Sequence, residues 1–131
     1  REWFSQSAIA PWFTFVEGKT PAILTNAQIG YGFDLIFVDS DHGIEHTRSE
    51  FTQLLSMSKP DTIFVFHDLP EWISPEDRSV PEVRSWLLDM VARGHMYGII
   101  LPTSEQLDCK SMWGPSYPKQ CGPHLGLFMR R

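Results

Sequence analysis

Two stretches of this sequence decide its fold: FDLIFVDSDH at residues 33–42 and IFVFHD at residues 63–68. Each contains a short run, residues 35–38 or 63–66, of aliphatic and aromatic residues without a charge. Such runs are typical of strands buried on both faces of a parallel sheet. Polar residues follow both runs, and ligands of open parallel sheets bind where the strands end. The sequence therefore predicts a ligand site at the carboxyl ends of these two strands.

Two helices are expected around these strands. Apolar residues recur at helical spacing between residues 44 and 57, and Pro60 favours a turn that leads into the second strand. A strand, a helix and a strand in this order predict parallel pairing. Ser79 and Glu82 have the spacing of a capping box at the start of a second helix, which Gly94 can end in the left-handed conformation.

Three more apolar runs complete the expected sheet. A first strand is expected at residues 12–16, because Gly18 and Pro21 follow it and interrupt regular structure. Two last runs, separated by a segment rich in glycine and proline, predict a terminal antiparallel hairpin. The expected elements are therefore strands at residues 12–16, 33–38, 62–66, 96–101 and 125–129, with helices at residues 44–57 and from residue 79 to just before residue 94.

Composition limits the size of the fold and its partners. With 131 residues, of which 42% are hydrophobic, the chain can form one core, so we expect a single domain. A formal net charge of −5 supplies no positive field to hold a nucleic acid. No apolar stretch approaches the roughly 20 residues that span a bilayer, and the first residues do not resemble a signal peptide. We therefore expect a cytoplasmic protein without nucleic-acid or membrane partners.

The cysteines and three of the histidines form no recognisable constellation. Cys109 and Cys121 are expected to be free thiols rather than a disulfide, because the chain shows no secretion signal. His46, His95 and His124 have no matching partners in the sequence and are expected on the surface or in loops.

The order of elements and motifs resembles the carboxyl-terminal half of class I S-adenosylmethionine-dependent methyltransferases. The resemblance rests on FDLIFVDSDH (33–42), KPD (59–61), IFVFHD (63–68) and the closing GLFMRR (126–131), and it spans residues 12–131. The chain looks most similar to small-molecule and sugar O-methyltransferases whose sites hold a divalent metal. The resemblance implies an α/β fold with a doubly wound, mostly parallel, Rossmann-like sheet, truncated at the amino terminus and closed by an antiparallel hairpin.

The resemblance also implies a role for each strand-end residue. Asp39, His67 and Asp68 fall where such enzymes hold their metal, and His42 falls where some of them hold a general base. Mg²⁺ prefers oxygen ligands and lowers the pKa of a hydroxyl that it binds, so a neutral imidazole can remove the proton. The deprotonated acceptor then attacks the methyl group of S-adenosylmethionine. Imidazole is a less usual ligand for Mg²⁺ than a carboxylate, so the identity of the metal stays open.

The cofactor site is only partly represented in the resemblance. Gly18 and Thr20 match the turn that lies against the adenine of the cofactor in the family. The family's glycine-rich loop and ribose-binding acid have no counterpart upstream of Trp12, which implies that the amino-terminal half of the fold is absent. That absence would bare an edge of the strand at residues 33–38, and a bare edge is a template for pairing. We expect the segment at residues 12–16 or a second copy, in a homodimer, to cover it.

Three functions stay open at this point. The first is an S-adenosylmethionine-dependent O-methyltransferase that acts on a small-molecule hydroxyl, and the second is a catalytically silent relative that serves as an oligomerising or binding module. The third is a hydrolase in which the same Asp and His residues hold a metal that activates water, although no hydrolase motif is recognisable. Against all three stands a structural interpretation, in which Asp39 and Asp68 only cap the turns that follow their strands.

Overall fold

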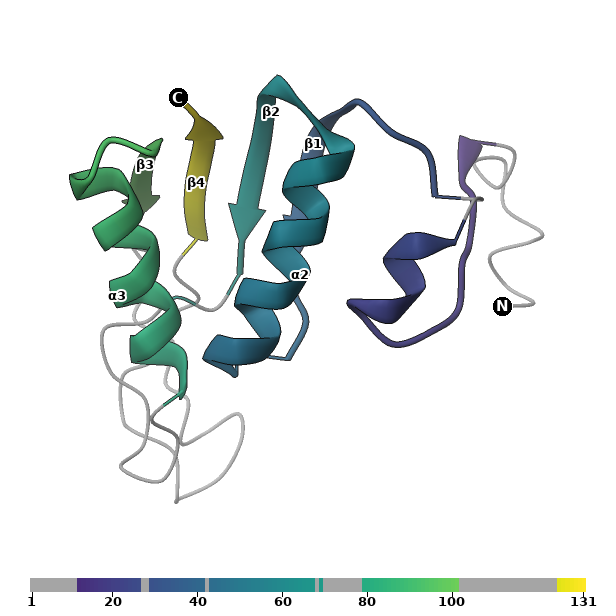
Figure 1. Ribbon diagram of the computed structural model, residues 1–131, viewed down its shortest axis with the longest axis horizontal. Helices are drawn as coiled ribbons and strands as arrows, with labels where there is room; N and C mark the ends of the chain where they lie inside the picture. The colour runs from purple at the N-terminus through teal and green to yellow at the C-terminus, as the bar shows by residue number, and fades with distance from the viewer. Residues whose placement is uncertain (1–11, 27–28, 42, 68, 70–78, 102–124) are drawn as a thin grey trace, which may run out of the picture.

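The computed structural model describes residues 12–26, 29–41, 43–67, 69, 79–101 and 125–131 (Figure 1). Its elements follow the chain in the order expected of an α/β protein, apart from the first strand. They are the 3-10 helix η2 (Ala22–Thr25), strand β1 (Phe33–Val38), helix α2 (Ile44–Met57), strand β2 (Ser58–Phe66), helix α3 (Ser79–Ala92), strand β3 (Met96–Leu101) and strand β4 (Leu125–Arg130).

The strands form one mixed sheet in the order β1-β2-β4-β3. Strand β1 pairs in parallel with β2, whereas β4 runs antiparallel to both of its neighbours. Three of the four strands therefore share one direction, with β4 reversed between β2 and β3. The predicted parallel pairing, the terminal hairpin and the Rossmann-like α/β class are confirmed.

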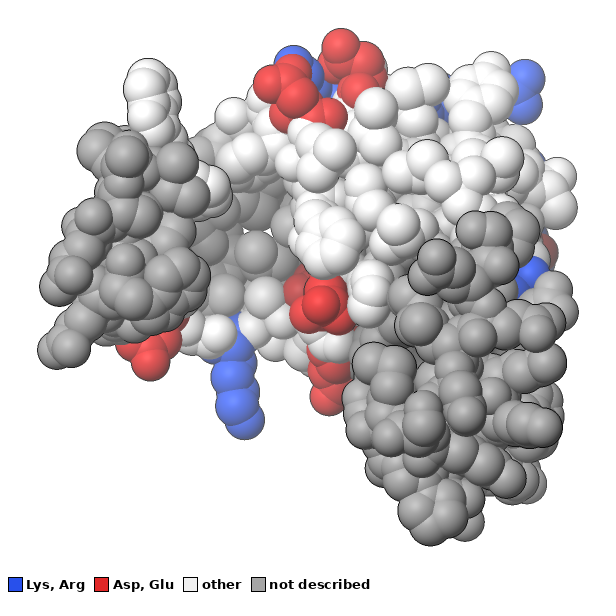
Figure 2. Space-filling model, turned by 180° about the vertical axis from the view of Figure 1, so that it is seen from behind, with Lys and Arg blue, Asp and Glu red and all other residues white. Residues whose placement is uncertain are grey.

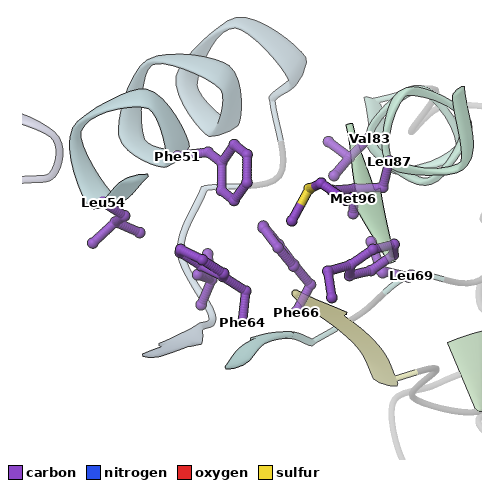
Figure 3. Close-up of a cluster of buried hydrophobic side chains, with 10 residues drawn as sticks. Phe51, Leu54, Phe64, Phe66, Leu69, Val83, Leu87 and Met96 are labelled. Carbon is purple, nitrogen blue, oxygen red and sulfur yellow. The ribbon is translucent and has the colours of Figure 1, made fainter. Parts of the chain in front are cut away.

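Helix α2 packs on the sheet through the apolar stripe that its sequence predicted. Phe51 is almost fully buried, and its ring meets those of Phe64 on β2 and Trp86 on α3 edge-on, at centroid distances of 5.0 and 5.5 Å. Figure 3 shows the Phe51 side chain pointing from α2 into the space between the sheet and α3. The core is therefore an aromatic cluster that joins both helices to the central strands.

Helix α3 ends as the sequence predicted. Gly94 has a φ of 75°, its amide donates to Val91 O at 2.9 Å, and the amide of His95 donates to Met90 O at 2.9 Å. These two bonds are the Schellman pattern, which satisfies carbonyls at a helix end and needs a residue that tolerates positive φ. The turn delivers the chain directly into β3. The side chain of Ser79, at the other end of the helix, lies outside the described residues.

The start of β2 differs from the prediction. The segment at residues 59–61 was expected to be a turn before a strand at residues 62–66, but β2 already begins at Ser58. Phe33 pairs with Ser58 and Leu35 with Ile63, so the extra residues are accommodated as an irregularity in the ladder. Because Pro60 has no amide proton, it fits such an irregular stretch better than a regular one.

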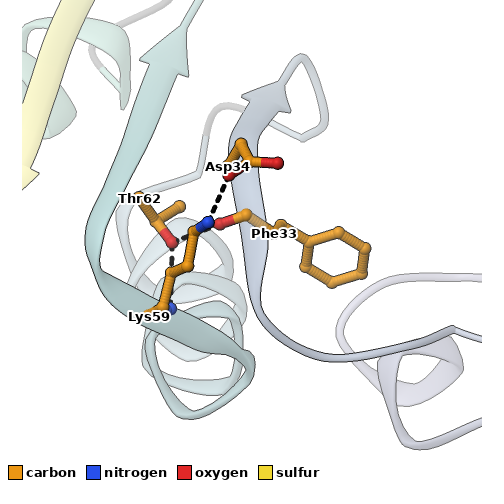
Figure 4. A network of polar contacts seen from close by, with 4 residues as sticks. All are labelled: Phe33, Asp34, Lys59 and Thr62. Carbon is orange, nitrogen blue, oxygen red and sulfur yellow. Dashed lines mark hydrogen bonds and ion pairs between the residues drawn. The ribbon is translucent and has the colours of Figure 1, made fainter.

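Thr62 holds this irregularity together. Its side chain is fully buried; Oγ1 accepts a bond from Lys59 N at 2.9 Å and donates to Phe33 O at 2.5 Å (Figure 4). The ammonium group of Lys59 also pairs with Asp34, and this hydrogen bond holds the pKa of Lys59 above its usual value of 10.5. Any stability that the exposed pair adds is present below pH 10.5 and is lost as the pH rises through the elevated pKa.

The expected first strand at residues 12–16 is wrong. No residue from Phe13 to Glu17 has regular secondary structure, and Trp12, Phe13 and Phe15 are largely exposed. A strand needs a neighbour that takes up its backbone hydrogen bonds, and this segment is not part of the described sheet. This segment therefore does not cover the edge of β1 as a strand. Of the two arrangements expected for that edge, pairing with residues 12–16 is wrong.

Helices α2 and α3 lie on one face of the sheet (Figure 1). On the other face, several apolar side chains of β1, β2, β3 and β4 are open to solvent, although Val65 is buried. Figure 2 shows this face as a largely uncharged surface between small groups of acids and bases. The second helical layer of a doubly wound fold is thus not supplied by the part of the chain that the structure describes. Cys109, Cys121 and His124 lie outside that part.

Truncating the centre of the core should destabilise the whole sheet. We expect Phe51→Ala to lower the free energy of unfolding by about 3–5 kcal/mol, because it removes a buried ring and leaves a cavity. Leu88→Ala, at a half-exposed position on α3, should cost less than about 1 kcal/mol. Urea unfolding followed by circular dichroism measures both, and equal losses would contradict the packing described here.

Removing the Thr62 hydroxyl should be costly although little volume changes. We expect Thr62→Val to lower the free energy of unfolding by about 1–3 kcal/mol, because Lys59 N and Phe33 O each lose their partner. Thr52→Val is the matched control, since the Thr52 hydroxyl is exposed and bonds only within its own helix, to Arg48 O. Urea midpoints of the two variants that coincide would show that the bonds of Thr62 contribute nothing.

Candidate functional site

The parallel pairing of β1 and β2 brings Asp39 and His67 together. Val38 and Phe66 are register partners, so the next residue of each strand leaves the sheet at the same level. The amide of His67 donates to Val38 O at 3.0 Å, which continues the ladder to the end of the strand. His67 Nδ1 lies 3.5 Å from Asp39 Oδ1, and the two side chains are 30% and 52% exposed. A carboxylate and an imidazole thus share one partly open edge.

Helix α2 fixes the loop that carries Asp39. Glu50 is almost completely buried, with 4% of its surface exposed, and its Oε2 accepts a hydrogen bond from Ser40 Oγ at 2.5 Å. A buried carboxylate is costly unless it is hydrogen-bonded. Ser40 is the residue directly after Asp39, so the bond holds the main chain beside the site.

A second buried side chain of α2 reaches the same loop. Thr47 Oγ1 donates to Asp41 O at 3.2 Å, and Thr47 is itself 4% exposed. Asp41 Oδ1 accepts from Gly43 N at 2.8 Å, which is the side-chain bond of an Asx turn. The side chain of Asp41 therefore starts the turn that leads into α2, whereas the capping interpretation had been made for Asp39 and Asp68.

The space beside these residues is small. A cavity of about 10 Å³ is lined by Ser40, Asp41, Thr47 and His67, with apolar side chains behind them. That volume is at the lower limit for one water molecule, so it does not hold a substrate. A larger groove lies at the opposite end of the strands, between Leu55, Met90 and Arg130, and no predicted site residue lines it.

The structure describes two of the three predicted metal ligands. Asp39 and His67 lie close enough to bind one ion, but Asp68 and His42 are outside the described residues. Within the described ranges, no cluster of three or more Asp, Glu, His or Cys side chains could hold a metal. A carboxylate oxygen and an imidazole nitrogen fit two positions of a divalent site, and the third ligand expected from the sequence is Asp68.

The predicted cofactor-binding residues, Gly18 and Thr20, lie in the loop before η2. A Cβ atom at Gly18 would be only 2.6 Å from Ile23 Cδ1, so the glycine is needed for packing within this loop. Thr20 Oγ1 lies 3.2 Å from His46 Nε2 on α2, which ties the loop to the helix. His46 was expected on the surface or in a loop, and it lies half-buried on α2. The adenine role of Gly18 and Thr20 stays a prediction.

Sequence reasoning missed Glu50 and Thr47. Both lie on the buried stripe of α2 beside Phe51, where a polar residue is unusual. The signal that could have identified them is their spacing. They are two polar residues three positions apart on an otherwise apolar stripe, and this stripe follows a strand that ends in Ser and Asp.

In the described part of the chain, none of the helices is both long enough and apolar enough to cross a bilayer.

Comparisons with known proteins place the fold in a broader context. A family described as Methyltransferase domain matches residues 1–69, slightly more than half of the chain. The solved structure of a proposed O-methyltransferase from Klebsiella pneumoniae is similar, with 22% identity and a TM-score of 0.60 over 90% of this chain and 49% of that one. An O-methyltransferase from Bacillus cereus in complex with SAH gives 19% identity and a TM-score of 0.49, over 77% of this chain and 41% of that one.

No curated protein matches the sequence. The chain spans about half the length of the solved structures that it matches.

The bond between Ser40 and Glu50 can be tested by removing one partner. We expect Ser40→Ala to lower the free energy of unfolding by about 1–3 kcal/mol, because it leaves the buried carboxylate without its donor. Glu50→Gln should cost less than Glu50→Leu, since the amide oxygen can still accept from Ser40. Urea unfolding at pH 7 compares the variants. If Glu50→Leu were the least costly of the three, the loop would not depend on this bond.

Proposed function

This chain belongs to the Methyltransferase domain family, and we propose that it forms the carboxyl-terminal part of an S-adenosylmethionine-dependent O-methyltransferase that acts on a small-molecule hydroxyl. The proposal rests on one observation above all. Two polar side chains, Asp39 and His67, meet at the carboxyl ends of neighbouring parallel strands, with Nδ1 and Oδ1 3.5 Å apart. That edge is where open α/β sheets bind their ligands.

The strand-end residues suit the chemistry of methyl transfer to a hydroxyl. Asp39 and His67, with Asp68 beside them in the sequence, would hold a divalent cation, and the cation would lower the pKa of a bound hydroxyl. His42, three residues after Asp39, would accept the proton of that hydroxyl as a neutral imidazole. The bonds from Glu50 and Thr47 to the loop keep Asp39 in place for this role.

The remaining binding groups must come from elsewhere. The cavity beside Asp39 and His67 admits at most one water molecule. Gly18 and Thr20 are the residues of this chain that we assign to the cofactor, on the resemblance alone. The chain spans half of the similar solved structure, so we propose that the rest of the cofactor site and the acceptor pocket are formed by polypeptide outside these 131 residues.

Cofactor binding tests the proposal directly. We expect a protein that includes the remaining part of the fold to give a saturable heat with S-adenosylhomocysteine in isothermal titration calorimetry. We expect Mg²⁺ to leave the cofactor affinity unchanged or to strengthen it, because the cation binds the acceptor hydroxyl and not the cofactor. A flat titration up to about 1 mM ligand, with and without Mg²⁺, would contradict an active transferase. It would favour instead a silent relative that keeps the fold.

Metal binding at the strand ends has its own test. Mn²⁺ bound there should broaden the imidazole resonances of His67 in NMR spectra, and Asp39→Asn should weaken the binding about tenfold or more, because it removes a charged ligand. Asp89→Asn is the matched control, since this acid makes the same change in net charge but pairs with Arg93 on α3. Equal losses in both variants would mean that Mn²⁺ responds only to the overall charge.

A further inference from the structure

The groove at the opposite end of the strands from Asp39 has the size of a small-molecule site. Helices α2 and α3 both end beside it, where β4 also ends (Figure 1). Its volume is about 620 Å³, and sites for small molecules usually have about 300–1,000 Å³. No residue that we assign to methyl transfer lines this groove, so its role is a separate question.

The groove lies on the helical face of the sheet. Arg130, which lines it, is the register partner of the buried Met96, so both side chains leave the sheet on the side of the core. A second helical layer of a doubly wound fold would pack on the opposite face. A strand added at the bare edge of β1 would be separated from β4 by β1 and β2. Neither addition would fill this groove.

The lining of the groove is apolar inside and basic at its rim. Met96 is buried and Leu55 and Met90 are half-buried, whereas the side chains of His95 and Arg130 are exposed. None of the lining residues is an acid. Within the described part of the chain, no acid forms an ion pair with Arg130, so its charge is not neutralised by a neighbour.

The two bases are not needed to cap the helices that end beside them. Basic side chains near a helix end often donate to its last carbonyls. Here the carbonyl of Met90 on α3 already accepts from the amide of His95. The carbonyl of Leu55 on α2 accepts from both the amide and the hydroxyl of Ser58. The guanidinium of Arg130 is therefore open to a ligand.

We propose that the groove binds a small aromatic carboxylate. The guanidinium of Arg130 offers a planar fork of donors that matches a carboxylate, and the ring of His95 lies at the same rim. One guanidinium balances one carboxylate group, which selects a monoanion. Met90 and Met96 receive the ring, because thioether side chains adapt their shape and contact aromatic rings favourably.

Naphthalene-2-carboxylate is the probe, and naphthalene-2-carboxamide is its uncharged counterpart. In NMR spectra of the chain with labelled methionine methyl groups, the carboxylate should shift Met90 and Met96 saturably, with a dissociation constant below about 1 mM. Met129 is the internal control, because it is exposed on the opposite face of the sheet and should not shift. The carboxamide should bind at least about tenfold more weakly, since it forms no charge-assisted bond with Arg130.

A pair of arginine variants tests the contact with the carboxylate. Arg130→Gln should weaken carboxylate binding at least about tenfold and leave carboxamide binding unchanged. Arg131→Gln is the matched control: it makes the same change in net charge, but its guanidinium lies 5.5 Å from the ring centroid of Tyr97. Ser56→Asp, at an exposed position of the lining, should also weaken carboxylate binding, because it adds a negative charge. Circular dichroism checks that each variant is folded.

Four results would each overturn the proposal. Equal losses in Arg130→Gln and Arg131→Gln would mean that the carboxylate responds only to net charge. A shift of Met129 without shifts of Met90 and Met96 would place the ring on the other face of the sheet. Shifts of Met90 and Met96 that depend on protein concentration without a probe would mean that a second copy fills the groove. The fourth is the absence of any methionine shift up to about 2 mM probe.

Discussion

The parallel pairing of β1 with β2 is the constraint on which the rest of the structure depends. It follows from two apolar runs joined by a helix. It fixes the relative direction of the two strands and the register at which both of them end. The candidate site is a direct result, since Asp39 and His67 are simply the next residues along each strand. Helix α2 is held on one side of this pair by Phe51, and on the same helix Glu50 and Thr47 reach the loop at the strand end. Core and site are thus two parts of one packing arrangement.

The sequence could predict those elements whose signal is local. The period of α2, the glycine that ends α3 and the β-branched and aromatic runs of β1, β3 and β4 are all local patterns, and the structure has these elements where they were expected. The segment at residues 12–16 shows the limit of such patterns. Its aromatic run has the composition of a strand, but a strand exists only if another strand pairs with it, and composition carries no information about that neighbour.

The candidate site was predictable in outline but not in its supporting contacts. The pairing of Asp39 with His67 follows from strand order alone. The hydrogen bond that Ser40 donates to Glu50 and the one between Thr20 and His46 join residues that are 10 and 26 positions apart, and neither could be predicted from periodicity. The buried Glu50 is informative for this reason. An apolar side chain at that position would avoid the cost of burying a carboxylate, so its presence indicates that the helix serves the loop as well as the core.

The irregular start of β2 has a consequence for folding fidelity. Side chains alternate along a strand, so sliding β2 by one residue against β1 would turn Phe64 and Phe66 to the wrong side and expose the core. A run of similar apolar residues offers little resistance to such an error. The hydrogen bond from the Thr62 hydroxyl to Phe33 O joins β2 to β1, so it forms in the correct alignment and is lost in the slipped one. The buried Thr62, near the start of the pairing between β1 and β2, thereby favours the native register of the two strands.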